Sequence, residues 1–399
     1  MQLELPGKPH LTYCTNIHAG ETWDEIEAAL TRFLPAVKRE IAPEQPMGVG
    51  LRLSAMAATQ LSQPAALARF KDMLRQGGFY VFTVNAFPYG AFHGQRVKER
   101  VYEPDWRTPE RLAFTNTVAD LLAEIGPSGM DLSISTVPGG FRAQIRSDAD
   151  IERIVEGYVR AAAHLHGLSE RTAQTLLLAI EPEPACFLET TREAIRFLND
   201  RVFTRSACAL FARLTGVSLP EAEASLRRHL GLCFDACHSA VAFEDAEEIL
   251  ADVCSSGITI GKVQLSAALS ANGAPSQFEE LLGRFDDGIY LHQTVQRRDG
   301  ALTRHTDLPE ALEAARRGEA GGEWRVHCHV PVFVDRFGGL RSTQRELREV
   351  LAVCRRQNVS PHLEVETYTW DVLPTALRSP EIVGDIVREL QWVRGELGA

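Results

Sequence analysis

The chain alternates between short apolar runs and longer stretches in which apolar residues recur at helical spacing. Each short run ends in polar residues, which is typical of a strand that enters a loop. Several intervening helices begin with a capping pair, in which a Ser, Thr or Asp is followed three positions later by Glu. These pairs are Thr22–Glu25, Thr190–Glu193, Ser218–Glu221 and Asp245–Glu248. The predicted strands cover residues 10–16, 47–54, 79–86, 129–136, 175–183, 231–238, 261–268 and 362–370.

Eight strands that alternate with helices predict an all-parallel sheet covered by helices on its outer face. Eight such repeats close most naturally into a (β/α)8 barrel, the TIM barrel of the α/β class. No glycine-rich dinucleotide motif follows the first strand, and no linker divides the sequence. We therefore expect a single domain over residues 1–399.

Residues 290–308 interrupt this repeat after the seventh predicted strand. Asp299-Gly300 lies there between alternating residues, a pattern typical of a two-residue β-hairpin turn. We expect a hairpin insertion over about 290–308, at the mouth of the barrel. The apolar run 324–333 is expected to be an extended segment that follows it.

The composition narrows the class of partner. Hydrophobic residues make up 45% of the 399 residues, which suffices for a full core. Lys and Arg number 42 against 53 Asp and Glu, so the formal net charge is −11. Proteins that bind polyanions are usually basic. We therefore expect a small-molecule substrate and no nucleic acid, and we leave the possibility of an oligomer open.

The cysteines and the apolar runs indicate the compartment. The eight cysteines are scattered, without the spacing of a structural zinc site or a disulfide framework. Cys233 and Cys237 are interpreted as small buried residues. The beginning of the chain lacks a signal-peptide core, and no run is long enough for a transmembrane segment. These features predict a reduced, soluble, cytoplasmic protein.

Acidic side chains collect where the later predicted strands end, which is where (β/α)8 barrels carry their functional residues. Glu181 lies at the end of the fifth strand, and Glu366 lies in the eighth. Asp235 and His238 form a DxxH pattern at the end of the sixth. Buried carboxylates are costly without a cation, so the three acids predict a divalent metal site. Such ligands suit Mn²⁺, Mg²⁺, Co²⁺, Fe²⁺ or Zn²⁺.

Further polar residues extend this candidate site. Gln264 in the seventh strand suits a metal ligand and a polar barrel-lining residue equally well. His327 and His329 alternate in an apolar run, so they share one face and suit metal ligands or imidazoles of an edge strand. The candidates for substrate binding are Asn16, His18, Arg52, Asn85 and His238.

The stretches LLLAIEPEP, FDACH, KVQLS and HLEVET together resemble the xylose isomerase-like barrel superfamily, which includes sugar epimerases and endonuclease IV. The resemblance implies a metal held at Glu181, Asp235, Gln264 and Glu366, although Gln264 stands where the family has histidine. His327 and His329 are similar to the DxH pair of the endonuclease branch. Phe87 replaces a histidine of that branch, which argues against a complete three-metal nuclease centre.

A closer resemblance is to the bacterial EboE family, which is encoded with other metabolite traffic proteins. It covers the stretches LTYCTNIHAGETWDE, CFDACHSAV, YLHQTV and RVHCHVPVF. It implies a role in the processing or traffic of secondary-metabolite precursors, with partners from the same system.

Three functions follow as hypotheses. The first is a metal-dependent sugar isomerase or epimerase, with Glu181 and Glu366 as the catalytic acid–base pair. The second is a metal-dependent hydrolase or phosphodiesterase of the endonuclease IV type, with His327 and His329 as additional metal ligands. The third is a barrel that binds a metabolite without turnover.

Overall fold

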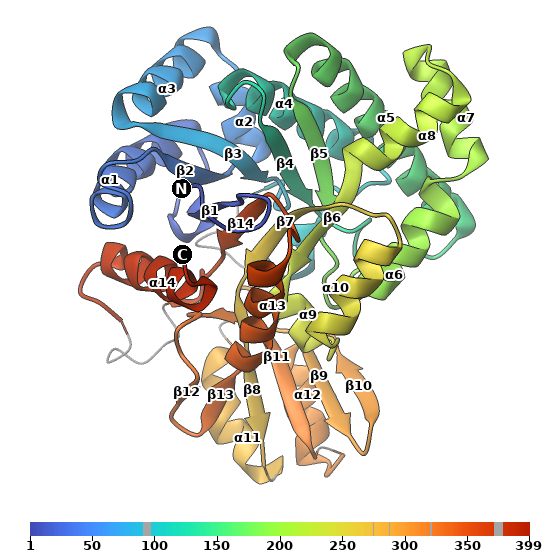
Figure 1. Cartoon of the computed structure of the whole chain (residues 1–399). Coiled ribbons are helices and arrows are strands. Elements are labelled where there is room, and N and C mark those ends of the chain that lie inside the picture. Colours follow the sequence, from blue (N-terminus) through green and yellow to red (C-terminus); the bar gives the residue numbers. More distant parts are fainter. Residues whose placement is uncertain (91–96, 274, 287, 320, 371–377) are drawn as a thin grey trace.

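Eight parallel strands form one sheet in the computed structural model, which describes residues 1–90, 97–273, 275–286, 288–319, 321–370 and 378–399. They pair in the order β1-β14-β7-β6-β5-β4-β3-β2. A parallel bridge between Cys14 and Gly50 joins the two outermost strands and closes the barrel (Figure 1). The predicted (β/α)8 barrel is therefore confirmed. Its strands are β1 (His10–Tyr13), β2 (Met47–Arg52), β3 (Phe79–Asn85), β4 (Asp131–Thr136), β5 (Thr175–Ile180), β6 (Leu230–Asp235), β7 (Ile260–Leu265) and β14 (His362–Val365).

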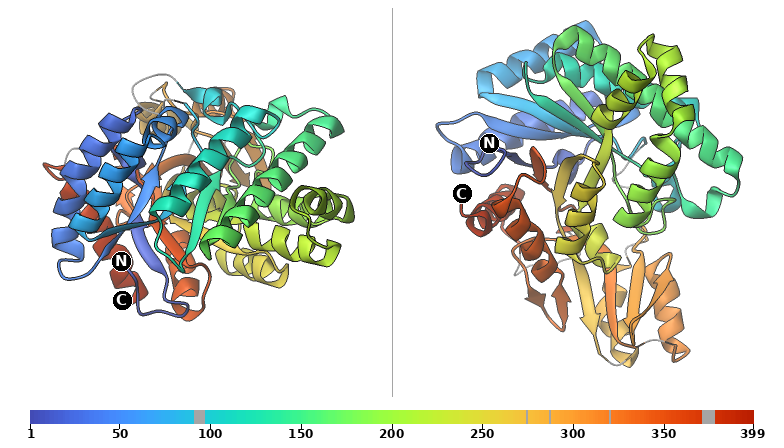
Figure 2. Two further views of the ribbon diagram at one scale, coloured as in Figure 1. Left: turned by 90° about the horizontal axis from the view of Figure 1, so that it is seen from above. Right: turned by 45° about the vertical axis from the view of Figure 1, so that its right-hand side comes forward.

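Helices surround the barrel on its outer side, as the view from above shows (Figure 2, left). All four predicted capping residues accept a hydrogen bond from the backbone N–H three positions on, and Thr22 with Glu25 forms a complete capping box. The barrel helices are α1 (Trp23–Ile41), α2 (Ala55–Leu61), α3 (Pro64–Gly77), α4 (Pro109–Ile125), α5 (Asp148–Thr172), α6 (Thr191–Phe197), α7 (Arg205–Thr215), α8 (Leu219–His229), α9 (Ala236–Val241), α10 (Ala246–Ser255), α13 (Gln344–Arg356) and α14 (Ile382–Leu397). Short 3₁₀ turns cover Thr15–Ile17, Lys98–Tyr102, Arg142–Gln144 and Gly283–Phe285, and a π-helical turn covers Leu198–Val202.

Two strands end earlier than the apolar pattern predicted. β5 ends at Ile180, because Pro182 two positions on has no N–H to donate to a sheet. β6 ends at Asp235, whose side chain caps α9 by accepting hydrogen bonds from two N–H groups of its first turn. The sequence had indicated that His238 lies at a strand end, but it lies on helix α9.

The region that follows β7 differs most from the sequence prediction. The run 261–268 is not one strand, because β7 ends at Leu265 and the chain enters a second sheet at Ala267. This sheet has six antiparallel strands in the order β10-β9-β11-β8-β13-β12. The insertion thus spans about 267–342 and is larger than the expected 290–308. Its elements are β8 (Ala267–Asn272), α11 (Pro275–Leu282), β9 (Thr294–Arg298), β10 (Ala301–His305), α12 (Leu308–Arg316), β11 (Glu323–Val330), β12 (Arg336–Phe337) and β13 (Leu340–Ser342).

The insertion has a hydrophobic core of its own and projects from one end of the barrel (Figure 2, right). Leu269 of β8 and Trp324 of β11 are buried in this core together with Phe278 of α11 and Leu312 of α12. β11, predicted as an extended segment, is an inner strand that pairs with β8 and β9. β9 and β10 pair around Asp299-Gly300. Both turn residues have positive φ angles, 52° and 82°.

An ion pair occupies the interior of the barrel below the strand ends. Lys262 Nζ lies 2.5 Å from Glu364 Oε2, and both side chains are fully buried. Burial opposes the charged form of Lys262, but the neighbouring carboxylate raises the pKa of the ammonium above its usual value. Gly50 leaves room for this pair, since a Cβ there would lie 1.8 Å from Glu364 Oε1. The barrel interior is therefore polar, and its stability depends on matched charges.

Among the residues that the structure describes, no helix combines the length and the apolar character needed to cross a membrane.

We expect Lys262→Met to lower the free energy of unfolding by about 3–5 kcal/mol, because it leaves the Glu364 carboxylate buried without its partner. The double variant Lys262→Met with Glu364→Leu is expected to recover most of that loss, because neither charge remains. Urea denaturation followed by circular dichroism measures both values. Equal losses in the single and double variants would contradict this role of the ion pair.

Candidate functional site

Three carboxylates meet at the C-terminal ends of β5, β6 and β14. Glu181, Asp235 and Glu366 are 3–4% exposed, and each contributes an oxygen to a group in which all atoms lie within 4.8 Å of one another. Burial raises the pKa of both Glu181 and Glu366 well above the usual range, and the neighbouring carboxylates raise it further. Three like charges this close require a cation or bound protons.

The oxygens of this carboxylate group are unequally satisfied. Asp235 Oδ1 accepts hydrogen bonds from the backbone N–H groups of Cys237 (2.7 Å) and His238 (3.0 Å) and from the Ser266 hydroxyl (2.8 Å). Asp235 Oδ2 and Glu181 Oε2 are buried and have no hydrogen-bond partner within the described part of the chain. An unpaired buried carboxylate oxygen is strongly destabilising. The two oxygens therefore fit the ligand set of a divalent cation.

Three amide groups hold the third carboxylate. Glu366 Oε1 accepts hydrogen bonds from Asn16 Nδ2 (2.8 Å) and Asn85 Nδ2 (2.9 Å), and its Oε2 accepts one from Gln264 Nε2 (2.6 Å). The oxygen of Gln264 accepts a hydrogen bond from the Cys233 thiol at 2.7 Å. Both the nitrogen and the oxygen of the Gln264 amide are thus hydrogen-bonded. The nitrogen orients Glu366, and the Gln264 oxygen, predicted as a metal ligand, points toward Cys233. Asn16 and Asn85 do reach the site.

Three imidazoles form a second group beside the carboxylates. Nε2 of His327 lies 3.1 Å from Nε2 of His238 and 3.1 Å from Nε2 of His329. His238 comes from α9, whereas His327 and His329 come from β11 of the insertion. Asp235, His238 and His329 also have ligand atoms within 4.8 Å of one another. The imidazole group and the carboxylate group therefore adjoin at Asp235.

The hydrogen bonds of these rings determine their tautomers. His238 Nδ1 lies 3.0 Å from Pro182 O, and His327 Nδ1 lies 2.6 Å from Gln293 Oε1. His329 Nδ1 lies 3.0 Å from Glu366 O. Backbone oxygens only accept, so two of the Nδ1 atoms carry the proton. The Gln293 amide nitrogen donates to the Tyr102 hydroxyl (2.8 Å) and to Pro184 O (2.9 Å), so its oxygen faces the ring. All three Nδ1 atoms are donors, and three Nε2 lone pairs face one another.

Facing lone pairs repel unless a proton or a metal ion lies between them. Burial lowers the pKa of His238 and His327 well below the usual value. His329 lowers the pKa of both rings further, and His238 also lowers that of His327. Burial likewise lowers the pKa of His329. Protonation is therefore disfavoured, and the three nitrogens fit the ligand set of a transition metal such as Zn²⁺. Hydrogen bonds from Nδ1 to oxygen are also the usual support of metal-binding histidines.

A cavity of about 60 Å³ opens above both groups. Sequence reasoning missed Tyr102, Glu183 and Gln293, which lie in or beside it. Burial raises the pKa of Glu183 to about 7, while hydrogen bonds from Tyr102 (2.7 Å) and Gln293 (3.3 Å) act in the opposite direction. Glu183 follows Glu181 by two positions, and this spacing was an available signal, but nothing local marked the other two. The cavity is lined by Asn16, Asn85, Phe87, Pro88, Lys98, Val101, Tyr102, Glu181, Glu183, His238, Tyr290, Leu291, His327, His329, Glu366 and Tyr368.

Two predicted substrate-binding residues lie elsewhere. His18 stacks on Phe33 of α1, with ring centroids 4.3 Å apart, because the 3₁₀ turn after β1 turns the chain away from the cavity. Arg52 donates to Glu21 Oε2 (3.0 Å) and to the backbone oxygens of Gly20 and Gly90. Neither side chain lines the cavity, so the structure assigns both to loop packing.

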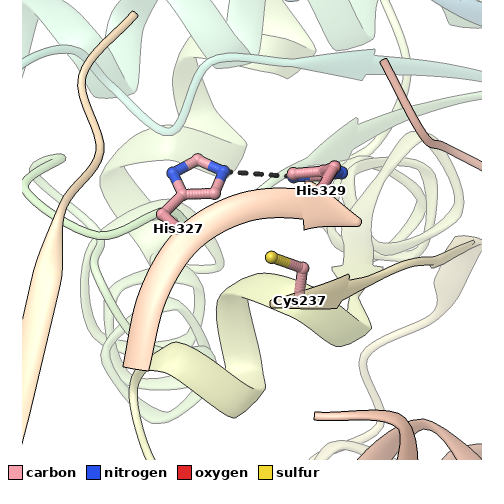
Figure 3. Close-up of side chains that lie close together, drawn as sticks. All are labelled: Cys237, His327 and His329. Carbon is pink, nitrogen blue, oxygen red and sulfur yellow. Dashed lines mark hydrogen bonds between the residues drawn. The ribbon is translucent and has the colours of Figure 1, made fainter. Parts of the chain in front are cut away.

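Cys237 lies near the imidazole group without sharing its orientation. Its sulfur and ligand atoms of His327 and His329 lie within 4.8 Å of one another. Figure 3 shows the sulfur on the other side of the β11 ribbon from the two rings. Burial raises the pKa of the thiol well above its usual value, and Asp235 raises it further. The interpretation of Cys237 as a buried structural residue agrees with this placement.

The fold and the site together define a (β/α)8 barrel protein with buried, metal-type ligands at the C-terminal ends of its strands. Neither a scan against protein-family models nor a search of curated proteins finds a match. Similar solved structures include the IolI protein with a bound zinc atom, which has a TM-score of 0.48 and 12% identity over 97% of each chain. A D-tagatose 3-epimerase-like protein has a TM-score of 0.47 and 9% identity, covering 98% of this chain and 97% of its own.

A xylose isomerase domain protein from Planctomyces limnophilus has a TM-score of 0.45 and 12% identity, covering 88% of this chain and 89% of its own. These three structures match most of this chain and of their own chains, at identities of 12% or less. At these identities and TM-scores they say nothing of this chain's activity, and the fold assignment rests on its own strand pairing. The specific resemblance to the EboE family stays a prediction.

In metal-free protein we expect His238, His327 and His329 to carry the proton on Nδ1 and to remain neutral at about pH 6, near the ordinary pKa of histidine. The rings are expected to be neutral because their pKa values are lowered, and a group with a lowered pKa releases its proton at a lower pH. ¹⁵N chemical shifts of the imidazole nitrogens measure both properties. Protonated Nε2 atoms at pH 6 would contradict the assigned tautomers.

Proposed function

We propose that the protein is a metal-dependent hydrolase that holds two divalent cations side by side and cleaves a phosphate ester of a small metabolite. The observation that carries this proposal is the convergence of three Nε2 lone pairs beside a separate group of three carboxylates. A single cation, even one held by Asp235, His238 and His329, leaves other ligand atoms of both groups unpaired. Two adjacent cations satisfy both.

Each group would hold one ion. Glu181, Asp235 and Glu366 offer oxygens, which suit Mg²⁺ or Mn²⁺ as well as softer ions. The three histidines offer nitrogens, which suit Zn²⁺, Co²⁺ or Fe²⁺. Paired ions in hydrolases supply Lewis acidity and lower the pKa of water.

The chain's own residues would orient the reactants. Gln293 positions His327 through Nδ1, and the amides of Asn16, Asn85 and Gln264 hold Glu366. Phe87, Tyr102 and Tyr368 line the cavity and reduce the access of bulk water.

Glu183 is suited to transfer a proton in this site. Its carboxyl lines the cavity, and its raised pKa of about 7 allows it to accept and release a proton near neutral pH. Its Oε1 lies 3.8 Å from His327 Nδ1, so a proton held there is close to the imidazole group.

A sugar isomerase or epimerase is the second candidate. It is favoured by Glu181 and Glu366, because two carboxyls with raised pKa values beside one cation suit an acid–base pair. Under either reaction, the substrate class suggested by the EboE resemblance is a precursor of a secondary metabolite.

We expect two divalent ions per chain by elemental analysis of protein purified without chelators. His327→Ala should reduce the count to one, because it removes the central imidazole of the nitrogen group. His164→Ala is the matched control, since this histidine is partly exposed and pairs with Asp120 on the barrel surface. Wild-type protein with one ion would contradict the two-ion centre.

The two reactions are separated by assays with the metal-loaded protein. We expect phosphate release from a panel of phosphorylated metabolites, and a loss of at least about 100-fold in kcat/KM for His327→Ala, consistent with the loss of a ligand or its support. An isomerase would instead incorporate deuterium from D₂O next to the substrate carbonyl and would retain this exchange in His327→Ala. Exchange without phosphate release would establish the second candidate.

A further inference from the structure

A second, larger cavity lies on the insertion, apart from the metal-type ligands. It has a volume of about 450 Å³ and is lined by one face of the insertion sheet and by the N-terminal turn of α13. Every side chain that lines it is charged or hydrogen-bonding, so no apolar side chain contributes to its wall. We call it the arginine groove, after Arg297, Arg325, Arg341, Arg345 and Arg348.

The two faces of the insertion sheet differ in character. One face carries the apolar core, with Leu269 and Trp324 in its centre. On the other face, Ser270 of β8 lies in register between Arg325 of β11 and Arg341 of β13. Residues in register on one face of a sheet are close neighbours, so two guanidinium groups flank one serine hydroxyl.

Acidic side chains neutralise the arginines of the groove to different extents. Arg325 forms ion pairs with Glu323 (2.8 Å) and Glu346 (2.6 Å). Glu323 also pairs with Arg297 (2.7 Å). Arg341 makes no ion pair within the residues that the structure describes. Arg345 and Arg348 pair with Glu349 (3.6 Å) and Glu396 (3.0 Å), which lie outside the lining. The positive charge that stays without an acidic partner among the described residues is therefore that of Arg341, on a protein whose net charge is −11.

Two further features make the groove a built site. Arg325 is 5% exposed and also donates to Ala240 O (2.7 Å), so the groove floor is rigidly held. α13 has 13 residues, and its N-cap Thr343 makes no side-chain capping hydrogen bond, although the Ser342 hydroxyl accepts one from Gln344 N–H (3.3 Å). The positive end of the helix dipole lies at the groove, which favours an anion there.

We propose that the arginine groove binds a small, multiply charged anion of the phosphate or diphosphate class, at a site separate from the metal-type ligands. Guanidinium groups bind phosphate oxygens through paired charge-assisted hydrogen bonds. Ser270, Asn272, Ser342 and Gln344 add neutral polar groups to the same wall. The proposal does not depend on the reaction at the barrel mouth.

Pyrophosphate is the probe, titrated into the full-length, metal-loaded protein by calorimetry at fixed free metal concentration. We expect Arg341→Ala and Arg345→Ala each to weaken binding roughly tenfold, which corresponds to the loss of one charge-assisted hydrogen bond. Arg355→Ala is the matched control, because Arg355 is an exposed arginine of α13 outside the groove. It should bind like the wild type. Thermal melts verify that each variant is folded.

Several results would overturn the proposal. Binding that is lost in Glu181→Gln and retained in Arg341→Ala would place pyrophosphate at the metal-type ligands. An equal loss in Arg355→Ala would indicate general charge attraction. Tighter binding of a ten-nucleotide single-stranded RNA or of phosphatidylglycerol vesicles than of pyrophosphate would assign the groove to a polymer or a membrane surface. Absence of pyrophosphate binding to the wild type would reject the site.

Discussion

The central constraint on this protein is the burial of unpaired ligand atoms at the mouth of a closed barrel. Asp235 Oδ2 and Glu181 Oε2 lie among like charges without a donor from the described residues, and three imidazole lone pairs meet beside them. In a low-dielectric interior such groups are destabilising by several kcal/mol unless positive charge is supplied. The surrounding hydrogen bonds nevertheless maintain this arrangement, since amides hold Glu366 and oxygen acceptors hold every Nδ1 atom.

The insertion contributes directly to this centre. β11 brings His327 and His329 to the strand ends, and the segment before β9 brings Gln293 to the Nδ1 atom of His327. The same face of β11 continues to Arg325, whose guanidinium donates to Ala240 in α9. Barrel and insertion are thus connected through the helix that carries His238. A shift of the insertion relative to the barrel would move two ligand atoms at once, those of His327 and His329.

Deeper in the barrel, buried charges are also stabilised by a partner of opposite charge. Lys262 and Glu364 neutralise each other below the strand ends, where Gly50 provides the space. The Lys262 ammonium also lowers the pKa of Glu181 and Glu366, in opposition to burial. It therefore favours the charged forms that a metal site needs. The polar interior supports the site electrostatically as well as sterically.

The sequence by itself determined the features that depend on neighbouring residues. Capping pairs, apolar periodicity and acids at strand ends are local, so the (β/α)8 barrel and the positions of Glu181, Asp235 and Glu366 could be predicted. The tertiary structure alone decided how distant segments meet. Pairing of β8 with β11 and β13 depends on contacts across dozens of residues, so a six-stranded insertion was expected only as a hairpin. The hydrogen bond that turns Gln264 toward Glu366, and the one that fixes His327 against Gln293, join strands and loops that no local pattern relates.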